Sequence, residues 1–228
     1  MPGSLFIDVK TDLTGTKETG LGRNPLPDMH AFAQKMMEKG ISADTPILLY
    51  TEGYNIGLFR AWYMLKFIGV QDVVVLYAPK SEWMKDRVVS GIEIPIDEMG
   101  TGLSFDEDRV RTQEDVKERM GQETLIDARD RARFAGYESD DKENTGHIPG
   151  ALNFPYQDTL WDEDLDADKI KEYFGDLGSK PITVYCGSGM TAGYDLLLLD
   201  EIGIDANLYA GSFSDWVSNP VNEIEQVK

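Results

Sequence analysis

The sequence predicts an α/β fold made of two similar domains, each a mostly parallel sheet flanked by helices. Two observations lead to this prediction. Short β-branched runs bounded by Gly and Pro alternate with helix-like runs, and the same order of runs occurs twice along the chain. Such runs are typical of buried strands, and their alternation with helices is typical of a parallel sheet.

The repeat consists of a strand-like run, a short loop, a helix-like run and a second strand-like run. Tyr50 and Tyr185 end the first runs of the two copies and lie 135 positions apart, and Tyr77 and Tyr209 close the second runs at a distance of 132 positions. Repeated order of this kind indicates two copies of one module. The matching runs are ILLY (47–50) and ITVY (182–185), LFRAWYML (58–65) and AGYDLLLLDE (192–201), and VVVLYA (73–78) and ANLYA (206–210).

Two further segments have clear helix signals. HAFAQKMMEKG (30–40) has apolar residues at helical spacing and a Gly at its end, which predicts an amphipathic helix that stops there. TQEDVKERMG (112–121) opens with Thr112 and Asp115 at the spacing of a capping box. The run TLIDAR (124–129) is then expected to be the first strand of the second copy.

Domain limits follow from a polar, acidic stretch with little periodicity at 95–109, which we expect to be a linker. The prediction is therefore a first domain at 1–94 and a second at 110–228. The chain begins at the turn MPGS, whereas the matching turn of the second copy, IPGA (148–151), follows a strand. We therefore expect the first domain to be shortened at its N-terminus.

Composition excludes several classes of function. The chain has 41 acidic and 22 basic residues among 228 and a formal charge of −19, which argues against nucleic-acid and anionic-membrane partners. One cysteine excludes an internal disulfide and a cysteine-rich zinc site, and it fits a reducing compartment. The start lacks the pattern of a secretory signal, and no stretch reaches the roughly 18 apolar residues of a membrane span. The predicted location is the cytoplasm.

The single cysteine, Cys186, lies in a setting that favours reactivity. It ends a strand-like run, and Gly187 and Gly189 allow the next residues to fold tightly with their N–H groups pointing inward. A helix predicted to begin near Thr191 adds its positive N-terminal dipole, and such a position lowers a thiol pKa. The alternative is an ordinary buried cysteine packed as a small apolar residue.

Two chemistries use an anion-binding loop of this kind. A cysteine phosphatase requires an Arg at the sixth position after the nucleophile, to bind the phosphoryl group in a bidentate manner. That position holds Ala192, and the loop carries no charge. A persulfide is a soft monoanion that N–H groups and hydroxyls can hold without a cation, so the loop favours sulfur transfer.

These residues carry a resemblance to a known family. Four stretches resemble the tandem-domain rhodanese sulfurtransferases: CGSGMTA, the downstream LYAGSFSDW, and the upstream LIDARDRARFAG and GHIPGALNFP. The neutral loop is similar to that of the 3-mercaptopyruvate sulfurtransferase branch. The resemblance implies an inactive first domain and a catalytic second domain, without a metal or organic cofactor.

The resemblance also implies a role for each matching residue. Cys186 would be the nucleophile that accepts sulfur, and Ser188 would bond the substrate or relay a proton. Arg133 matches the arginine that binds the substrate carboxylate, and Lys142 stands where a second basic residue often occurs. The persulfide loop would consist of Gly187, Ser188, Gly189, Met190 and Thr191.

Other readings of these residues stay open. Arg133 and Lys142 could each be an ordinary surface cation, and Asp127 could bond either the loop or Arg133. His147 lies in the turn GHIPG, so a structural role is favoured over a Cys–His dyad. Trp83 and Trp216 occupy equivalent places in the two copies and are expected to be core residues.

The expected reaction moves sulfur from 3-mercaptopyruvate through a cysteine persulfide to a thiol, cyanide or a thioredoxin-like protein. Two alternatives remain: thiosulfate as the donor, and a non-catalytic sulfur carrier or binding module. The shortened first domain motivates the second alternative.

Overall fold

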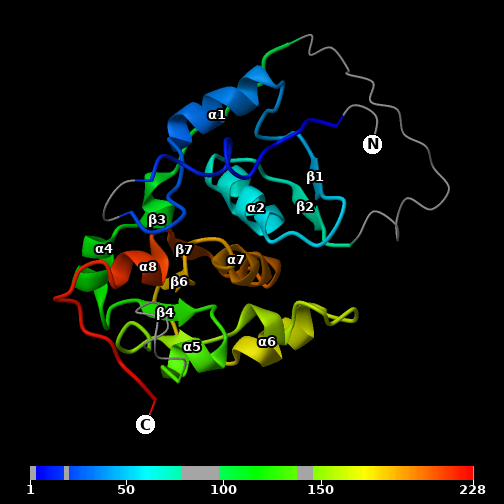
Figure 1. Ribbon diagram of the computed structural model, residues 1–228. Coiled ribbons are helices and arrows are strands. Elements are labelled where there is room, and N and C mark those ends of the chain that lie inside the picture. Colours follow the sequence, from blue (N-terminus) through cyan, green and yellow to red (C-terminus); the bar gives the residue numbers. More distant parts are fainter. Residues whose placement is uncertain (1–3, 18–20, 79–97, 138–145, 228) are drawn as a thin grey trace. The chain divides into compact units, whose positions relative to one another are not determined.

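The computed structural model describes residues 4–17, 21–78, 98–137 and 146–227 (Figure 1). It divides the chain into two compact units: unit 1 contains residues 1–15 and 26–106, and unit 2 contains residues 16–25 and 107–228. This division differs from the domain limits expected from sequence in two respects: residues 98–106 of the predicted linker group with unit 1, and residues 16–25 group with unit 2, because they pack against it.

Unit 1 contains the first strand–helix–strand segment. Its elements are helix α1 (Met29–Glu38), strand β1 (Ile47–Tyr50), helix α2 (Gly57–Phe67) and strand β2 (Val73–Leu76). The two strands are parallel, with Ile47 opposite Val73, and α2 packs against both. The helix predicted at 30–40 is present as α1, and Gly40 follows it with φ of +77°.

Unit 2 contains a five-stranded sheet in the order β3-β7-β6-β4-β5, and every pair in it is parallel. Its strands are β3 (Val110–Arg111), β4 (Thr124–Asp127), β5 (Leu152–Asn153), β6 (Ile182–Tyr185) and β7 (Ala206–Tyr209). Its helices are α4 (Gln113–Arg119), α5 (Arg131–Ala135), α6 (Ala167–Phe174), α7 (Ala192–Glu201) and α8 (Ser212–Trp216), with 3-10 turns at Glu107–Arg109 and Tyr156–Asp158.

Strand β6 lies at the centre of this sheet, between β7 and β4. All four of its residues are buried, which agrees with a continuous apolar run covered on both faces. The one polar side chain in it, Thr183, donates its hydroxyl to Glu123 at 2.5 Å. Helix α7 packs against β6 and β7, as α2 does against β1 and β2 in unit 1 (Figure 1).

The capping box predicted from sequence is present at the start of α4. The Asp115 N–H donates to Oγ1 of Thr112 at 3.1 Å, and the Thr112 N–H donates to Oδ2 of Asp115 at 2.9 Å. Hydrogen bonds from Thr112 hold the pKa of Asp115 below its usual value, because they favour the ionised carboxylate.

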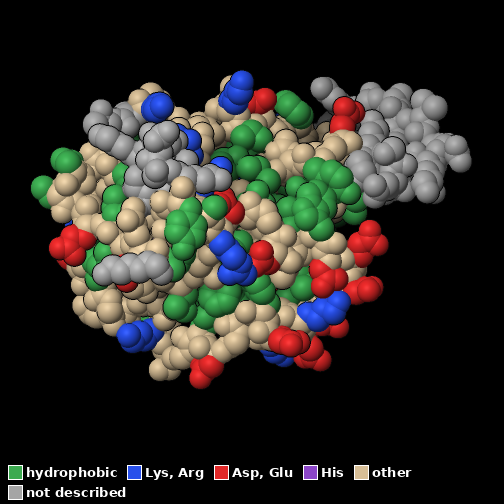
Figure 2. Space-filling view, turned by 60° about the horizontal axis from the view of Figure 1, so that its bottom comes forward, with side chains coloured by type: hydrophobic (Ala, Val, Ile, Leu, Met, Phe, Trp, Pro, Cys, Tyr) green, Lys and Arg blue, Asp and Glu red, His purple; other side chains and the backbone are tan. Residues whose placement is uncertain are grey.

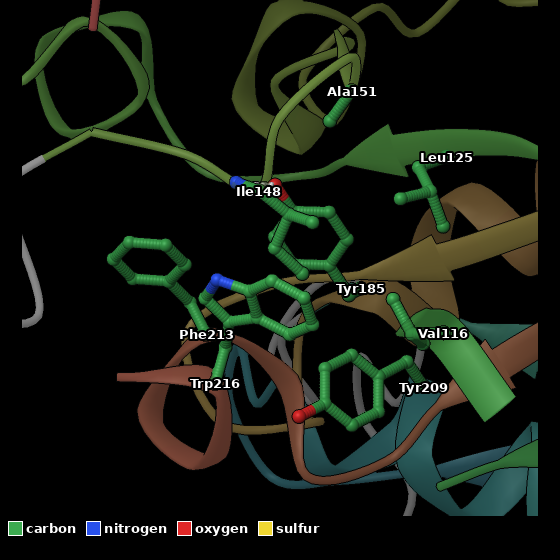
Figure 3. Packing of buried hydrophobic residues seen from close by; sticks show 8 residues of the cluster. All are labelled: Val116, Leu125, Ile148, Ala151, Tyr185, Tyr209, Phe213 and Trp216. Carbon is green, nitrogen blue, oxygen red and sulfur yellow. Dashed lines mark hydrogen bonds between the residues drawn. The ribbon is translucent and has the colours of Figure 1, made fainter. Parts of the chain in front are cut away.

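An aromatic core lies beneath the carboxyl ends of β6 and β7. Figure 3 shows Ile148 and Trp216 beside the ring of Tyr185. The Tyr185 hydroxyl accepts a hydrogen bond from the Ile148 N–H at 3.1 Å, which ties the turn at 148–151 to the central strand. Trp216 is buried as expected, whereas Trp83 lies outside the described residues.

The surface carries both acidic and basic side chains. On the face shown in Figure 2, the two kinds are interspersed among apolar and neutral residues. Within the described ranges, no helix is both long enough and apolar enough to cross a membrane.

Replacing Tyr185 with Phe removes the acceptor of the Ile148 N–H and keeps the ring. We expect the free energy of unfolding to fall by about 1–3 kcal/mol, because a buried N–H is left without a partner. Chemical denaturation with urea measures this change. Tyr137→Phe is the control, because Tyr137 is 70% exposed, and we expect it to leave stability unchanged. Equal stability of Tyr185→Phe and wild type would contradict this account.

Candidate active site

Cys186 directly follows β6, at the carboxyl end of the central strand. Residues 187–191 form a loop, and α7 begins at Ala192 with Thr191 as its N-cap residue. Gly189 has φ of +74°, a conformation that favours glycine and lets the loop fold back on itself. The carboxyl edge of a parallel sheet is a common position for a ligand site.

The backbone around Cys186 is fixed by the start of α8. The Phe213 N–H donates to the Cys186 carbonyl at 2.9 Å, and the Ser214 N–H donates to the Gly187 carbonyl at 3.0 Å. The buried Ser212 hydroxyl accepts from the Cys186 N–H at 3.2 Å and donates to the Tyr209 carbonyl at 3.0 Å. Ser212 has φ of +56°, an uncommon conformation for a residue with a side chain. These contacts hold Cys186 against the start of α8.

The thiol of Cys186 is held in a set of hydrogen-bond donors. Burial by itself raises its pKa, but hydrogen bonds to the sulfur from the Thr191 hydroxyl and then from backbone N–H groups outweigh that effect. The N–H groups belong to Ser188, Ala192 and Thr191. The pKa of Cys186 therefore lies below its ordinary value, and the thiolate form is favoured.

Access to the sulfur is limited. Cys186 is 1% exposed, whereas Gly187, Ser188, Met190 and Thr191 are half-buried and form the outer rim of the loop. A substrate must therefore approach over this rim. The five predicted loop residues lie together around the thiol, with Gly189 buried among them.

A buried ion pair supports the loop. Arg129 and Asp127 are both buried and are joined by a contact of 2.6 Å between Nη2 and Oδ2. Arg129 also donates to the Gly146 carbonyl at 2.6 Å and lies 3.9 Å from the ring centroid of Phe213. Asp127 thus pairs with Arg129 and not with Arg133 or the loop, because the two residues share one face of the extended chain.

Arg129 was not among the site residues predicted from the sequence, and the structure buries it. Burial is the largest single influence and lowers its pKa, but the charge of Asp127 and the hydrogen bonds to it, with smaller contributions from nearby groups, together outweigh burial, so the pKa is raised and Arg129 stays charged. The negative charge of Cys186 contributes in the same direction. The alternating pattern Asp-x-Arg was the sequence signal for this pair.

The two predicted substrate cations are placed differently. Arg133 lies on α5 with its side chain 46% exposed, and it pairs with Asp130 at 3.2 Å. Burial raises the pKa of Tyr156, and the charges of Arg133 and Cys186 both act on its hydroxyl. Arg133 and the thiol therefore lie within electrostatic range of the same phenol. Lys142 lies outside the described residues.

His147 has structural contacts. It is buried, its Nδ1 lies 2.8 Å from the Phe134 carbonyl, and its ring stacks on Phe134 with centroids 3.6 Å apart. Its backbone N–H donates to the Glu225 carbonyl. These contacts support its interpretation as part of a structural turn.

Two site features were not anticipated from the sequence. Asn24 donates from Nδ2 to the Ser188 hydroxyl at 2.8 Å, a contact between residues 164 positions apart that no local pattern reveals. Asp195 is fully buried in α7, and neither of its carboxylate oxygens has a hydrogen-bond partner among the described residues. A lone acid in the run AGYDLLLL was the signal for Asp195.

Burial is the largest cause that raises the pKa of Asp195 well above its usual value, and the nearby charges of Cys186, Asp127 and Asp158 act in the same direction. The protonated form is therefore favoured beside the thiolate. In the described part of the chain, no group of three or more His, Cys, Asp or Glu side chains is placed to hold a metal ion.

Replacing Thr191 with Val removes one hydrogen-bond donor to the sulfur and preserves the shape of the side chain. We expect the pKa of Cys186 to rise by roughly 1–2 units, because hydrogen bonds to a charged group contribute about 1.5–3 kcal/mol. The pH dependence of alkylation by iodoacetamide, followed by intact mass, measures this pKa. Thr11→Val, at an exposed threonine, is the matched control. An unchanged midpoint in Thr191→Val would refute the role of the hydroxyl.

Replacing Asp195 with Asn removes a buried carboxyl whose folded-state pKa is raised. Asp195 has a pKa of about 3.9 in the unfolded chain, so above this pH the unfolded wild type releases the proton whereas the folded wild type retains it. The free energy of unfolding of the wild type therefore falls with rising pH, by up to about 1.4 kcal/mol per pH unit. The stability of Asp195→Asn relative to wild type should therefore increase as the pH rises above about 4. Denaturant unfolding at several pH values tests this, with the exposed Asp164→Asn as control. A pH-independent difference would show that Asp195 is ionised in the folded protein.

Comparison with known proteins agrees with this geometry. The family model described as Rhodanese-like domain matches residues 112–219. A 3-mercaptopyruvate sulfurtransferase of Escherichia coli is 32% identical over 244 residues, covering 100% of this chain and 84% of the relative. A putative thiosulfate sulfurtransferase of Mycobacterium tuberculosis is 30% identical, covering 98% and 82%.

A solved structure is similar in fold. The crystal structure of SseA from Escherichia coli, which has the rhodanese fold, aligns with a TM-score of 0.71 at 31% identity and covers 93% of this chain and 82% of that one. The loop after Cys186 lies at the carboxyl edge of a parallel sheet, the sequence identity extends across the whole chain, and the fold is shared. Together these findings lead to one conclusion: this chain belongs to the rhodanese family of sulfurtransferases.

Proposed function

We propose that this chain transfers the sulfur of 3-mercaptopyruvate through a persulfide on Cys186. The observation that carries the proposal is the set of neutral donors around a buried thiol whose pKa is lowered. A thiolate is the nucleophile that sulfur transfer requires. The similarity to 3-mercaptopyruvate sulfurtransferases supports the choice of donor.

The first half-reaction is an attack of the Cys186 thiolate on the donor sulfur. A sulfur–sulfur bond forms, the carbon–sulfur bond of the donor breaks, and its electron pair leaves on carbon as the enolate of pyruvate. The proton of the donor thiol moves to that carbon, which gives pyruvate and a Cys186 persulfide anion. The same N–H groups and the Thr191 hydroxyl that hold the thiolate can hold this anion.

The second half-reaction regenerates the thiolate. A thiolate acceptor, cyanide or a thioredoxin-like protein attacks the outer sulfur, and the bond between the two sulfur atoms breaks with its electrons returning to Cys186. Donor and acceptor react in turn, which is ping-pong kinetics. Such a cycle fits a reducing compartment such as the cytoplasm, where the thiol escapes oxidation, and it involves no nucleic acid or membrane.

Each predicted site residue has a role in this scheme. Arg133 binds the carboxylate of the donor and exchanges its partly exposed ion pair with Asp130 for that contact. Lys142 is proposed as a second cation for the same group. Ser188 bonds the substrate. The persulfide lies within the loop Gly187, Ser188, Gly189, Met190 and Thr191.

Thiosulfate is a second candidate donor, favoured by the similarity to thiosulfate sulfurtransferases. A non-catalytic sulfur carrier is a third candidate. It predicts that Cys186 forms a persulfide and passes it on no faster than a free thiol does.

Intact-mass spectrometry after brief exposure to each donor tests the proposal. We expect a mass gain of one sulfur with 3-mercaptopyruvate, and none in Cys186→Ala, because the chain has no other cysteine. Cys186→Ser, with a weaker nucleophile of similar size, is expected to lose sulfur transfer. A gain with thiosulfate alone would favour the second candidate, and no gain with either donor would exclude a catalytic persulfide.

A further inference from the structure

A short segment from the first part of the chain lies against the loop of unit 2. Residues 16–25 belong to that unit, and three contacts of the described residues fix them there. The Arg23 N–H donates to the Ser214 hydroxyl at 3.0 Å, and Asn24 donates to the Ser188 hydroxyl at 2.8 Å. The third contact is a close approach of Gly22 to the Gly211 carbonyl.

The approach at Gly22 leaves no room for a side chain. Its φ is +76°, and a β-carbon there would lie 2.4 Å from the Gly211 carbonyl oxygen. The backbone at Gly22 therefore packs directly against the backbone at Gly211, and Arg23 and Asn24 are the next residues in the chain. The two side chains begin from a fixed position beside the residues that flank Cys186.

Arg23 extends toward the nucleophile loop. A β-carbon on Gly187 would lie 3.4 Å from Nη2 of Arg23. Gly187 follows Cys186 directly, and neighbouring Cα atoms are about 3.8 Å apart. The guanidinium of an exposed arginine is therefore next to the residue that adjoins the reacting sulfur.

A positive charge near this loop would favour the binding of an anionic donor. Residues 187–191 carry no charged side chain. The charge of Arg129 is balanced by Asp127 in a buried pair, and Arg133 lies on α5 beside Asp130. Arg23 brings a further guanidinium close to Gly187.

We propose that Arg23 is a specificity-determining residue, which binds the charged group of a donor whose anion is attached directly to the transferred sulfur, as in thiosulfate. This inference rests on the proposed sulfur transfer at Cys186. Asn24 is a positioning residue that orients the Ser188 hydroxyl beside the same substrate.

The two donors differ in where their charge lies. In 3-mercaptopyruvate, two carbon atoms separate the sulfur from the carboxylate carbon, so that the carboxylate extends away from Cys186. In thiosulfate, the sulfonate sulfur is bonded to the transferred sulfur. When the Cys186 thiolate attacks the outer sulfur, a new sulfur–sulfur bond forms, the old one breaks, and sulfite leaves with its electron pair as a dianion. A guanidinium beside Gly187 stabilises that leaving dianion through charge-assisted hydrogen bonds.

The test compares kcat/KM for both donors, with cyanide as acceptor, in wild type, Arg23→Gln, Arg23→Lys and Arg133→Gln. Arg23→Gln should reduce the value for thiosulfate about tenfold and that for 3-mercaptopyruvate less than about threefold. Arg23→Lys should retain part of the activity with thiosulfate, because it keeps the charge without the bidentate geometry. Arg133→Gln should show the opposite preference. Arg119→Gln, on α4, is the control and should leave the ratio unchanged.

A second measurement is independent of turnover. Isothermal titration of sulfite into persulfide-free protein should give binding that weakens about tenfold in Arg23→Gln, at an unchanged melting temperature. If wild type forms no persulfide with either donor, the proposed function fails and the sulfite titration alone decides the role of Arg23. Three results would each overturn the assignment. The first is an equal loss of kcat/KM for both donors in Arg23→Gln, and the second is a wild type that uses 3-mercaptopyruvate but does not turn over thiosulfate. The third is sulfite binding that is absent, or that is the same in wild type and Arg23→Gln.

Discussion

The site depends on the hydrogen bonds that hold the Cys186 sulfur. Burial disfavours a thiolate, because it removes water from the charge. The hydroxyl of Thr191 and the N–H groups at the start of α7 replace that water and lower the pKa below its ordinary value. The donors belong to one loop and one helix end, so in the proposed reaction they can keep their positions when the thiolate becomes a persulfide. They offer hydrogen bonds to the sulfur in a loop that has no charged side chain.

The remainder of unit 2 keeps the donors in place. Hydrogen bonds from the start of α8 fix the backbone on both sides of the Cys186–Gly187 peptide. The aromatic core beneath β6 and β7 anchors α8 through Phe213 and Trp216. The buried pair of Asp127 and Arg129 joins β4 to the turn before His147, with the carboxylate balancing the charge of the guanidinium. Removing one partner of such a pair is strongly destabilising, because the other charge remains buried.

Local signals in the sequence were sufficient for several elements. The capping box of Thr112 and Asp115, the helix that ends before Gly40 and the fully buried strand β6 could all be predicted, because each depends on neighbours a few positions away. The position of Cys186 between a strand and a helix was readable for the same reason. The burial of Arg129 was missed, because its partner and its covering ring come from separate elements.

The sequence by itself determined the fold class and the neutral character of the loop after Cys186, and it predicted Cys186 as the nucleophile. These properties follow from periodicity, glycine positions and the absence of charge over a few consecutive residues. The tertiary structure decided which distant groups meet the loop: Arg23 and Asn24 from residues 16–25, Ser212 from the start of α8, and the buried Asp195 beside the thiol. These contacts join residues far apart in the chain, and they exist only because packing of the sheet and its helices brings separate segments to one edge.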